Sequence, residues 1–266
     1  MSIFWVIIFG IIQGATEFLP VSSSAHLTIL GDVSKIKEED ALPFFLVLHL
    51  GTLIALLFFF YKDLLNLGKS FFKREDESIK TVLLIGVTTI VTGILGVLLK
   101  NFVEKAVSSS LWASGFLILT TLLLFSTKFL NKSKRVEMSI SSMSYLSSAL
   151  IGFAQGIAVF PGISRSGITI VVALYLGLSR KDAFNYSFLA SIPAIFGAFL
   201  LDLKDIGTVA HSFGFFVLIA GFFIALVVGF LSLEFLKKIV IRGNLHYFGY
   251  YTFLVALAGF AVSFYF

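Results

Sequence analysis

The sequence predicts an all-α integral membrane protein, a polytopic helical bundle of two inverted-topology repeats, each a re-entrant helix pair plus three transmembrane helices. Three observations lead to this fold class. Hydrophobic residues make up 58% of the 266 residues and charged residues only 13%, whereas a soluble domain carries about 25% charged residues. Apolar runs of near membrane-spanning length recur along the chain, and two broken apolar regions occupy matching places in its halves. We expect a single membrane domain over 1–266, with repeat 1 at 1–142 and repeat 2 at 143–266.

Six apolar runs are long enough to cross the hydrocarbon core of a bilayer, which takes roughly 20 helical residues. In chain order they are residues 41–61, 81–99, 111–130, 183–201, 212–235 and 247–266. Two further apolar regions, 1–31 and 145–178, are interrupted by Gly, Pro, Ser and charged residues. Irregular backbone is tolerated at membrane depth only where protein buries it or a wet cavity solvates it. We therefore predict that each of these two regions is a re-entrant helix pair.

The two broken regions match each other at an offset of 142 residues without gaps. GIIQG at 10–14 falls on GFAQG at 152–156, and the glycines in each have the small-xxx-small spacing of closely packed helices. The further identities pair Phe18 with Phe160, Ser22 with Ser164, and Ser24 with Ser166. Each half of the chain is thus one broken region followed by three spans.

Three spans are an odd number, so the two halves should face opposite ways across the membrane. If 62–80 is cytoplasmic, fourteen of the twenty Lys and Arg residues lie in loops on that side and five on the other. The positive-inside rule then predicts cytoplasmic loops at 62–80, 131–142 and 236–246, with both termini outside. The same loops account for the net charge of +5 without nucleic acid. The chain has no cysteine, which excludes disulfide and thiolate chemistry.

The first broken region carries the reactive stretch QGATEFLPVSSSAH, residues 13–26. Gln13 and Glu17 are four residues apart and share one face of a helix. Pro20 should end that helix, because the residue before a proline avoids the α conformation. Ser22, Ser23, Ser24 and His26 follow, where hydroxyl and backbone N–H groups can bind an anion or cap the next helix.

The second broken region reads FPGISRSGIT, residues 160–169. Ser164, Arg165 and Ser166 follow the Pro-Gly break, where another helix should begin. A guanidinium beside free backbone N–H groups suits a phosphate. The repeats differ where chemistry is needed, since the acid and imidazole are in the first and the cation is in the second. We predict that Glu17 and Arg165 lie close together, because a charge at membrane depth is a functional candidate by default.

Structural explanations compete with these functional ones. Glu17 and Arg165 can form a purely structural salt bridge, and the serines can be caps or turn residues. His26 can be a core histidine with satisfied nitrogens, and Gln13 can make a helix–helix hydrogen bond. His49 is a lone polar residue inside an apolar run, where we expect packing or support rather than catalysis.

Both motifs resemble those of the undecaprenyl-diphosphate phosphatase family of the bacitracin-resistance type. That family carries a Glu- or Gln-xxx-Glu motif followed by a PVSS segment with a His, and a PGxSRSxxT motif in its second half. Gln13 stands where many members have Glu, which puts a two-carboxylate metal site in doubt. The resemblance implies an enzyme of the bacterial cytoplasmic (inner) membrane that cuts the terminal phosphate from undecaprenyl diphosphate, recycles the carrier lipid for wall polymers and confers bacitracin tolerance.

The resemblance also assigns roles to residues of this chain. Glu17, Ser23, His26 and Arg165 are the implied catalytic residues. The implied substrate-binding residues are Ser22, Ser24, Ser164, Arg165, Ser166 and Thr169. Dependence on a divalent cation, Mg²⁺ or Ca²⁺, is implied, with Glu17 and Gln13 as its ligands. The expected partners are a polyprenyl diphosphate lipid and the bilayer, and homodimerisation is left open.

Phosphoryl transfer needs charge stabilisation and an in-line nucleophile. Arg165 would bind the diphosphate, and Ser23 or His26 would be the nucleophile or its base. A Ser23–His26 relay is one alternative, because the two are three residues apart on a helix, and attack by water with His26 as base is another. A lipid flippase or transporter is the main rival function, and it would release no phosphate. An anion channel is disfavoured because the motifs supply one arginine rather than a ring.

Overall fold

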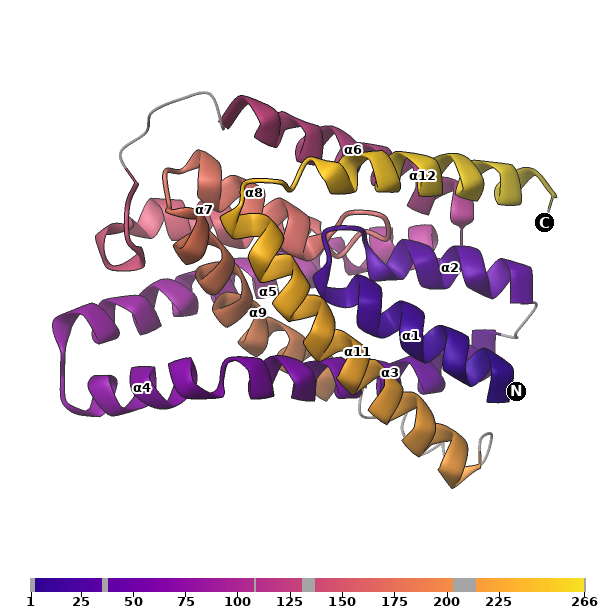
Figure 1. Cartoon of the computed structure of the whole chain (residues 1–266), viewed down its shortest axis with the longest axis horizontal. Coiled ribbons are helices and arrows are strands. Elements are labelled where there is room, and N and C mark those ends of the chain that lie inside the picture. The colour runs from indigo at the N-terminus through magenta and orange to yellow at the C-terminus, as the bar shows by residue number, and fades with distance from the viewer. Residues whose placement is uncertain (1–2, 35–37, 108, 131–136, 203–213, 266) are drawn as a thin grey trace.

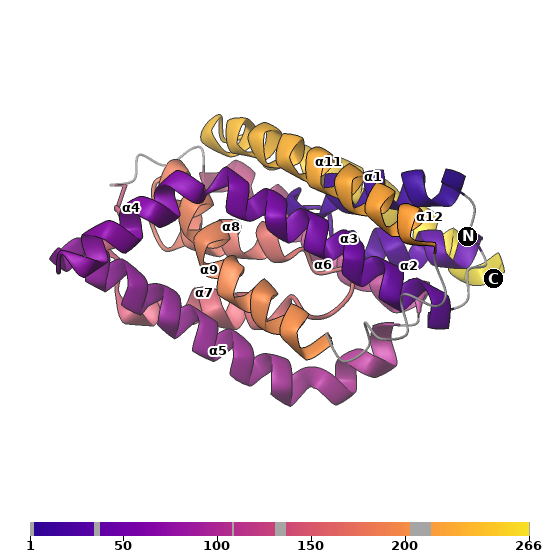
Figure 2. The same cartoon turned by 90° about the horizontal axis from the view of Figure 1, so that it is seen from below.

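The computed structural model describes residues 3–34, 38–107, 109–130, 137–202 and 214–265. Within these residues the chain is helical and forms no strand (Figures 1 and 2). The first half contains α1 (Ile3–Phe18), α2 (Ser23–Ser34), α3 (Glu38–Phe59), α4 (Tyr61–Phe72), α5 (Asp76–Val107) and α6 (Ser110–Leu130). The second half contains the short 3-10 helix η1 (Ile140–Ser142), then α7 (Tyr145–Ile157), α8 (Arg165–Tyr175), α9 (Arg180–Asp202), α11 (Phe215–Ile241) and α12 (Tyr247–Tyr265).

Each of the six predicted spans coincides with a long helix. Among the described residues, five helices are long and apolar enough to cross a membrane on their own, namely α5, α6, α9, α11 and α12. The sixth, α3, passes the same test together with α4, from which it is bent by 62°. The protein is therefore a multi-pass membrane protein.

The connection between α3 and α5 differs from the prediction. Residues 62–80, expected as a loop, are mostly helical and comprise α4 and the start of α5. Leu64, Leu67 and Phe71 recur along α4 at helical spacing, which is the pattern of an amphipathic helix. Similarly, α11 continues to Ile241 and shortens the expected loop at 236–246 to a turn. Part of the third expected loop, 131–136, lies outside the described residues.

The two broken regions are helix pairs, as predicted. Turns that contain Pro20 and Pro161 separate α1 from α2 and α7 from α8. The first helix of each pair has 16 and 13 residues, respectively. At a rise of 1.5 Å per residue, such helices span roughly 20–24 Å and fall short of a bilayer core of about 30 Å.

The first helix of each pair packs against a span from the other half of the chain. α1 lies along α11, and α7 lies along α5. Glycines permit both close approaches. A Cβ on Gly14 would lie 2.8 Å from the Ala225 carbonyl oxygen, and one on Gly152 would lie 2.7 Å from the Thr88 carbonyl oxygen. The small-xxx-small spacing therefore marks two backbone contacts, as predicted.

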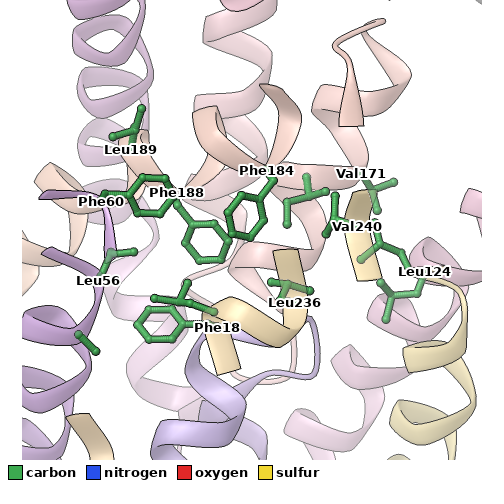
Figure 3. Close-up of a cluster of buried hydrophobic side chains, with 14 residues drawn as sticks. Phe18, Leu56, Phe60, Leu124, Val171, Phe184, Phe188, Leu189, Leu236 and Val240 are labelled. Carbon is green, nitrogen blue, oxygen red and sulfur yellow. The ribbon is translucent and has the colours of Figure 1, made fainter. Parts of the chain in front are cut away.

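The largest hydrophobic cluster fixes the end of α1. Phe18, the last residue of that helix, is fully buried among residues of α3, α6, α8, α9 and α11. Figure 3 shows its ring in this cluster, with Phe188 5.8 Å away between ring centroids and Phe184 a further 4.8 Å from Phe188. The residue that precedes Phe18 is Glu17, so this packing sets the position of the carboxylate.

Candidate active site

Glu17 is the centre of a polar cluster inside the bundle. Its side chain is only 5% exposed and forms an ion pair between Oε1 and Arg165 Nη2. Its Oε2 accepts hydrogen bonds from Ser23 Oγ at 2.7 Å and from Gln13 Nε2 at 3.0 Å. The predicted proximity of Glu17 and Arg165 is thus confirmed. A buried carboxylate with a guanidinium and a hydroxyl as partners can both orient a cation and accept a proton.

The turns of the two motifs are also joined directly. Ser22 Oγ accepts a hydrogen bond from the Gly162 N–H at 3.1 Å and lies 3.0 Å from Ser24 Oγ. Ser22 has a φ of 65°, a left-handed conformation that non-glycine residues rarely adopt and that costs about 1–2 kcal/mol. Ser166 Oγ donates to the Leu19 carbonyl at 3.3 Å. These bonds hold the two turns side by side and so place Arg165 against Glu17.

The start of α8 is capped by its own serine. Ser164 Oγ accepts from the Gly167 N–H at 3.2 Å and lies 3.3 Å from Ser166 Oγ. The Ser164 N–H donates to Thr120 Oγ1 of α6 at 3.1 Å. Ser164 therefore acts at least as a cap, one of the structural alternatives. Thr169, another expected substrate-binding residue, donates to the backbone carbonyl of Arg165 at 2.8 Å, and among the described residues no hydrogen bond joins it to the side chain of Glu17.

His26 bonds elsewhere than expected. Its Nδ1 lies 2.8 Å from the Ser22 carbonyl oxygen and its Nε2 lies 2.9 Å from the Tyr251 hydroxyl of α12. The two rings are stacked, with centroids 5.7 Å apart. Ser23 donates to Glu17 instead, so the Ser23–His26 relay suggested by their spacing is not formed in this structure. Ser22, with its left-handed backbone, directly precedes α2, and the side chains of Ser23 and His26 bond to different partners.

Two further residues lie at the site, His49, which was expected to pack or to support it, and Tyr251, which was not identified in the sequence. His49 Nε2 lies 3.7 Å from Glu17 Oε2, while its Nδ1 donates to the Phe45 carbonyl at 2.8 Å. In the sequence, His49 stood out as a lone polar residue in an apolar span. The structure places it beside the Glu17 carboxylate. Tyr251 gave no signal, because it is one of many aromatic residues in the last span.

Two side chains of the polar cluster carry oxygen atoms that could hold a divalent cation. Gln13 Oε1 is buried and has no hydrogen-bond partner within the described residues, and a carbonyl oxygen is a ligand suited to a hard cation. Within the same residues, no group of three or more His, Cys, Asp or Glu side chains could hold a metal. Gln13 and Glu17 are therefore the residues that could supply oxygen ligands, and Mg²⁺ commonly combines one or two protein ligands with substrate phosphates.

Comparisons with known proteins cover almost the whole chain. The family described as bacitracin resistance protein BacA matches residues 6–258. Three relatives are named undecaprenyl-diphosphatase. The protein of Methanosphaera stadtmanae is 40% identical, over 97% of this chain and 96% of its own. That of Methanobrevibacter smithii is 37% identical, over 99% and 98%, and that of Halothermothrix orenii is 40% identical, over 97% and 96%. With a family match of this extent and relatives of this similarity, the chain belongs to the bacitracin resistance protein BacA family.

Proposed function

We propose that this protein is an undecaprenyl-diphosphate phosphatase, which hydrolyses undecaprenyl diphosphate to undecaprenyl phosphate and inorganic phosphate. The observation that carries the proposal is the contact of Ser23 and Arg165 with the buried carboxylate of Glu17, where two turns meet inside the membrane bundle. The relatives that share nearly the full length of the chain bear the name of this activity. The flippase alternative is therefore not favoured.

The diphosphate would bind at Arg165 and at the beginning of α8. The Arg165 side chain is 24% exposed, so part of its guanidinium is accessible to an anion. Backbone N–H groups at the first turn of a helix add favourable partial charge for phosphate. We assign Arg165 to the charge that develops on the phosphoryl oxygens during transfer.

Ser23 is the nucleophile in this proposal, and Glu17 is its base. Their 2.7 Å hydrogen bond has the geometry of an activated hydroxyl. Ser23 Oγ attacks the terminal phosphorus while its proton passes to Glu17, and the anhydride P–O bond breaks with the lipid monophosphate as leaving group. Water then hydrolyses the phosphoserine, inorganic phosphate leaves, and Glu17 returns the proton to Ser23.

A divalent cation would be held by Gln13 Oε1 and Glu17 together with the diphosphate. When bound, it would neutralise negative charge on the phosphate oxygens. The buried, unpartnered oxygen of Gln13 supports this assignment. A chelator should then lower the rate, and Glu17→Gln should weaken cation binding as well as abolish turnover, because Glu17 is also the proposed base.

We further propose that the chain is one domain of two inverted repeats in the cytoplasmic (inner) membrane. Three observations support this arrangement. First, each half contributes a short helix pair and three spans. Second, α1 packs on α11 and α7 packs on α5, and each partner is the second span of the opposite half. The start of α1 and the end of α12 lie at one end of the bundle, and the α4–α5 corner lies at the other (Figures 1 and 2). The basic residues of that corner would face the cytoplasm.

The test is phosphate release from undecaprenyl diphosphate by the purified protein in detergent, with and without chelator. Wild type should release one phosphate per lipid, and Ser23→Ala should abolish turnover while it leaves the folded protein intact. Tyr175→Phe on α8, outside the polar cluster, is the matched hydroxyl control and should retain activity. Normal turnover in Ser23→Ala would exclude the serine nucleophile and leave direct attack by water. Transfer of intact lipid across vesicles without phosphate release would refute the phosphatase.

A further inference from the structure

An apolar groove lies beside the polar cluster, on the other side of the first turn. Its volume is about 320 Å³, and its lining comes from the end of α1, the turn after it, and the adjoining ends of α11 and α12. In Figure 1 the end of α1 lies in the angle between α11 and α12. The lining residues used below are Thr16, Leu19, Val21, Phe235 and Tyr251. The hydroxyl of Thr16 donates to the Ile12 carbonyl at 2.7 Å, so this threonine adds no free donor to the groove.

The turn at residues 19–23 separates the groove from the polar cluster and faces both. Leu19 and Val21 line the groove, whereas Ser22 and Ser23 bond to Gly162 and Glu17 on the polar side. An amphiphile whose diphosphate sits at Glu17 and Arg165 must pass its first apolar carbons across this turn. The groove is the apolar surface that begins there.

Tyr251 connects the groove with the site. Its ring lines the groove, and its hydroxyl meets His26 Nε2 at 2.9 Å. The Ser22 carbonyl can only accept a hydrogen bond, so His26 Nδ1 carries the ring proton in the neutral imidazole and Nε2 accepts from Tyr251. The Ser22 carbonyl thus fixes the tautomer of His26, and the Tyr251 hydroxyl holds the orientation of its ring.

We propose that this groove binds the isoprene units nearest the diphosphate, and that Tyr251 is a positioning residue that holds His26 at the boundary between tail and head. The proposal rests on the proposed phosphatase function and adds where the lipid chain binds. It commits to an isoprenoid chain because the groove is continuous with the head-group site through Tyr251 and the 19–23 turn. It follows that binding of the lipid chain in the groove and positioning of His26 by Tyr251 can be separated by mutation.

The experiment compares two substrates with the same diphosphate head, farnesyl diphosphate and the much shorter isopentenyl diphosphate. Phe235→Ala removes one wall of the groove and should lower kcat/KM for farnesyl diphosphate by about tenfold, through KM, with a much smaller change for isopentenyl diphosphate, which has a single isoprene unit. Phe223→Ala is the control, because Phe223 is a similarly exposed phenylalanine of the same helix (56% against 51%) outside the groove. It should leave both substrates unchanged.

Tyr251→Phe should show the opposite split. It keeps the ring in the groove and removes only the hydroxyl, so kcat should fall about fivefold for both substrates while KM for farnesyl diphosphate is retained. Two results for Phe235→Ala would overturn the groove assignment. One is a loss equal to that of Phe223→Ala, and the other is an equal loss with farnesyl diphosphate and isopentenyl diphosphate. Either would indicate that ordinary bilayer lipid occupies the groove. A change in self-association of Phe235→Ala without a change in KM would assign it to a second copy and also overturn the proposal.

A binding measurement separates this proposal from the phosphatase itself. Undecaprenyl phosphate, the proposed product, should raise the thermal stability of wild type and Phe223→Ala in detergent, and Phe235→Ala should need about tenfold more lipid for the same rise. This readout needs no turnover. If wild type releases no phosphate but Phe235→Ala weakens the stabilisation, the phosphatase fails and the groove stands. If the lipid stabilises all three proteins equally, the groove fails whatever the activity.

Discussion

The Glu17–Arg165 pair can be dissected by removing one charge or both. Arg165→Met leaves a carboxylate that is only 5% exposed without its ion-pair partner. Breaking a buried pair on one side typically costs about 3–5 kcal/mol. Glu17 retains its hydrogen bonds from Ser23 and Gln13, so we expect a loss of about 3 kcal/mol in the free energy of unfolding. The double variant Glu17→Gln with Arg165→Met removes both charges and should return to within about 1 kcal/mol of wild type.

The conservative change Arg165→Lys separates catalysis from stability. Lysine keeps the positive charge, so most of the stability should remain, but it lacks the planar, forked donors of arginine. If Arg165 stabilises the transferring phosphoryl group, kcat should fall by about 10²-fold or more. Unfolding in mixed detergent–SDS micelles gives the free energies for the four proteins, and initial phosphate release in matched detergent gives the rates.

Two results would refute this reasoning. Near-normal turnover in Arg165→Lys would make the pair purely structural. A double variant no more stable than Arg165→Met would show that the charges are not coupled and that the loss comes from the packing of the arginine side chain.

Further predictions concern the turns and the topology. Gly162→Ala should be strongly destabilising, by about 3 kcal/mol or more, because φ is +99° and a Cβ would lie 2.1 Å from an α6 backbone oxygen. Thermal melts measure the loss. The control Gly68→Ala, where a Cβ would meet nothing within 4 Å, should be neutral or stabilising. Ser22→Gly should be about 1 kcal/mol more stable than Ser22→Ala, since both lose the hydroxyl but only glycine relieves a φ of 65°; equal stabilities would show that this conformation is unstrained. Glu75 and Phe264 are both exposed and can be replaced singly by cysteine. An impermeant reagent should label Glu75→Cys only from inside and Phe264→Cys only from outside. Labelling of Glu75→Cys from outside would reverse the proposed orientation.

The spans and the meeting of the two motifs could be predicted from sequence, and the local hydrogen bonds could not. Runs of apolar residues set span positions because the bilayer demands length and hydrophobicity from one continuous segment. Glu17 and Arg165 could be paired because each is costly alone at membrane depth. The partner of His26 depends instead on the handedness of Ser22 and on where α12 passes, and neither leaves a pattern in the neighbouring residues. α4 was mistaken for a loop because its charges outweighed its helical periodicity.

The packing of α1 on α11 has a consequence for how the chain is made. The α1 glycines contact residues near position 225, which leave the ribosome roughly 10–40 s after α1 at synthesis rates of about 5–20 residues per second. Glu17 lacks Arg165, which follows it by 148 residues, for roughly the first 7–30 s, so for most of the interval the nascent N-terminal helix has both a charged residue and a glycine face without their final partners. Residues 1–142 expressed alone would remain in that state. Productive folding must therefore wait for the second half of the chain, and an arrested or truncated chain would offer quality-control proteases an incompletely packed helix.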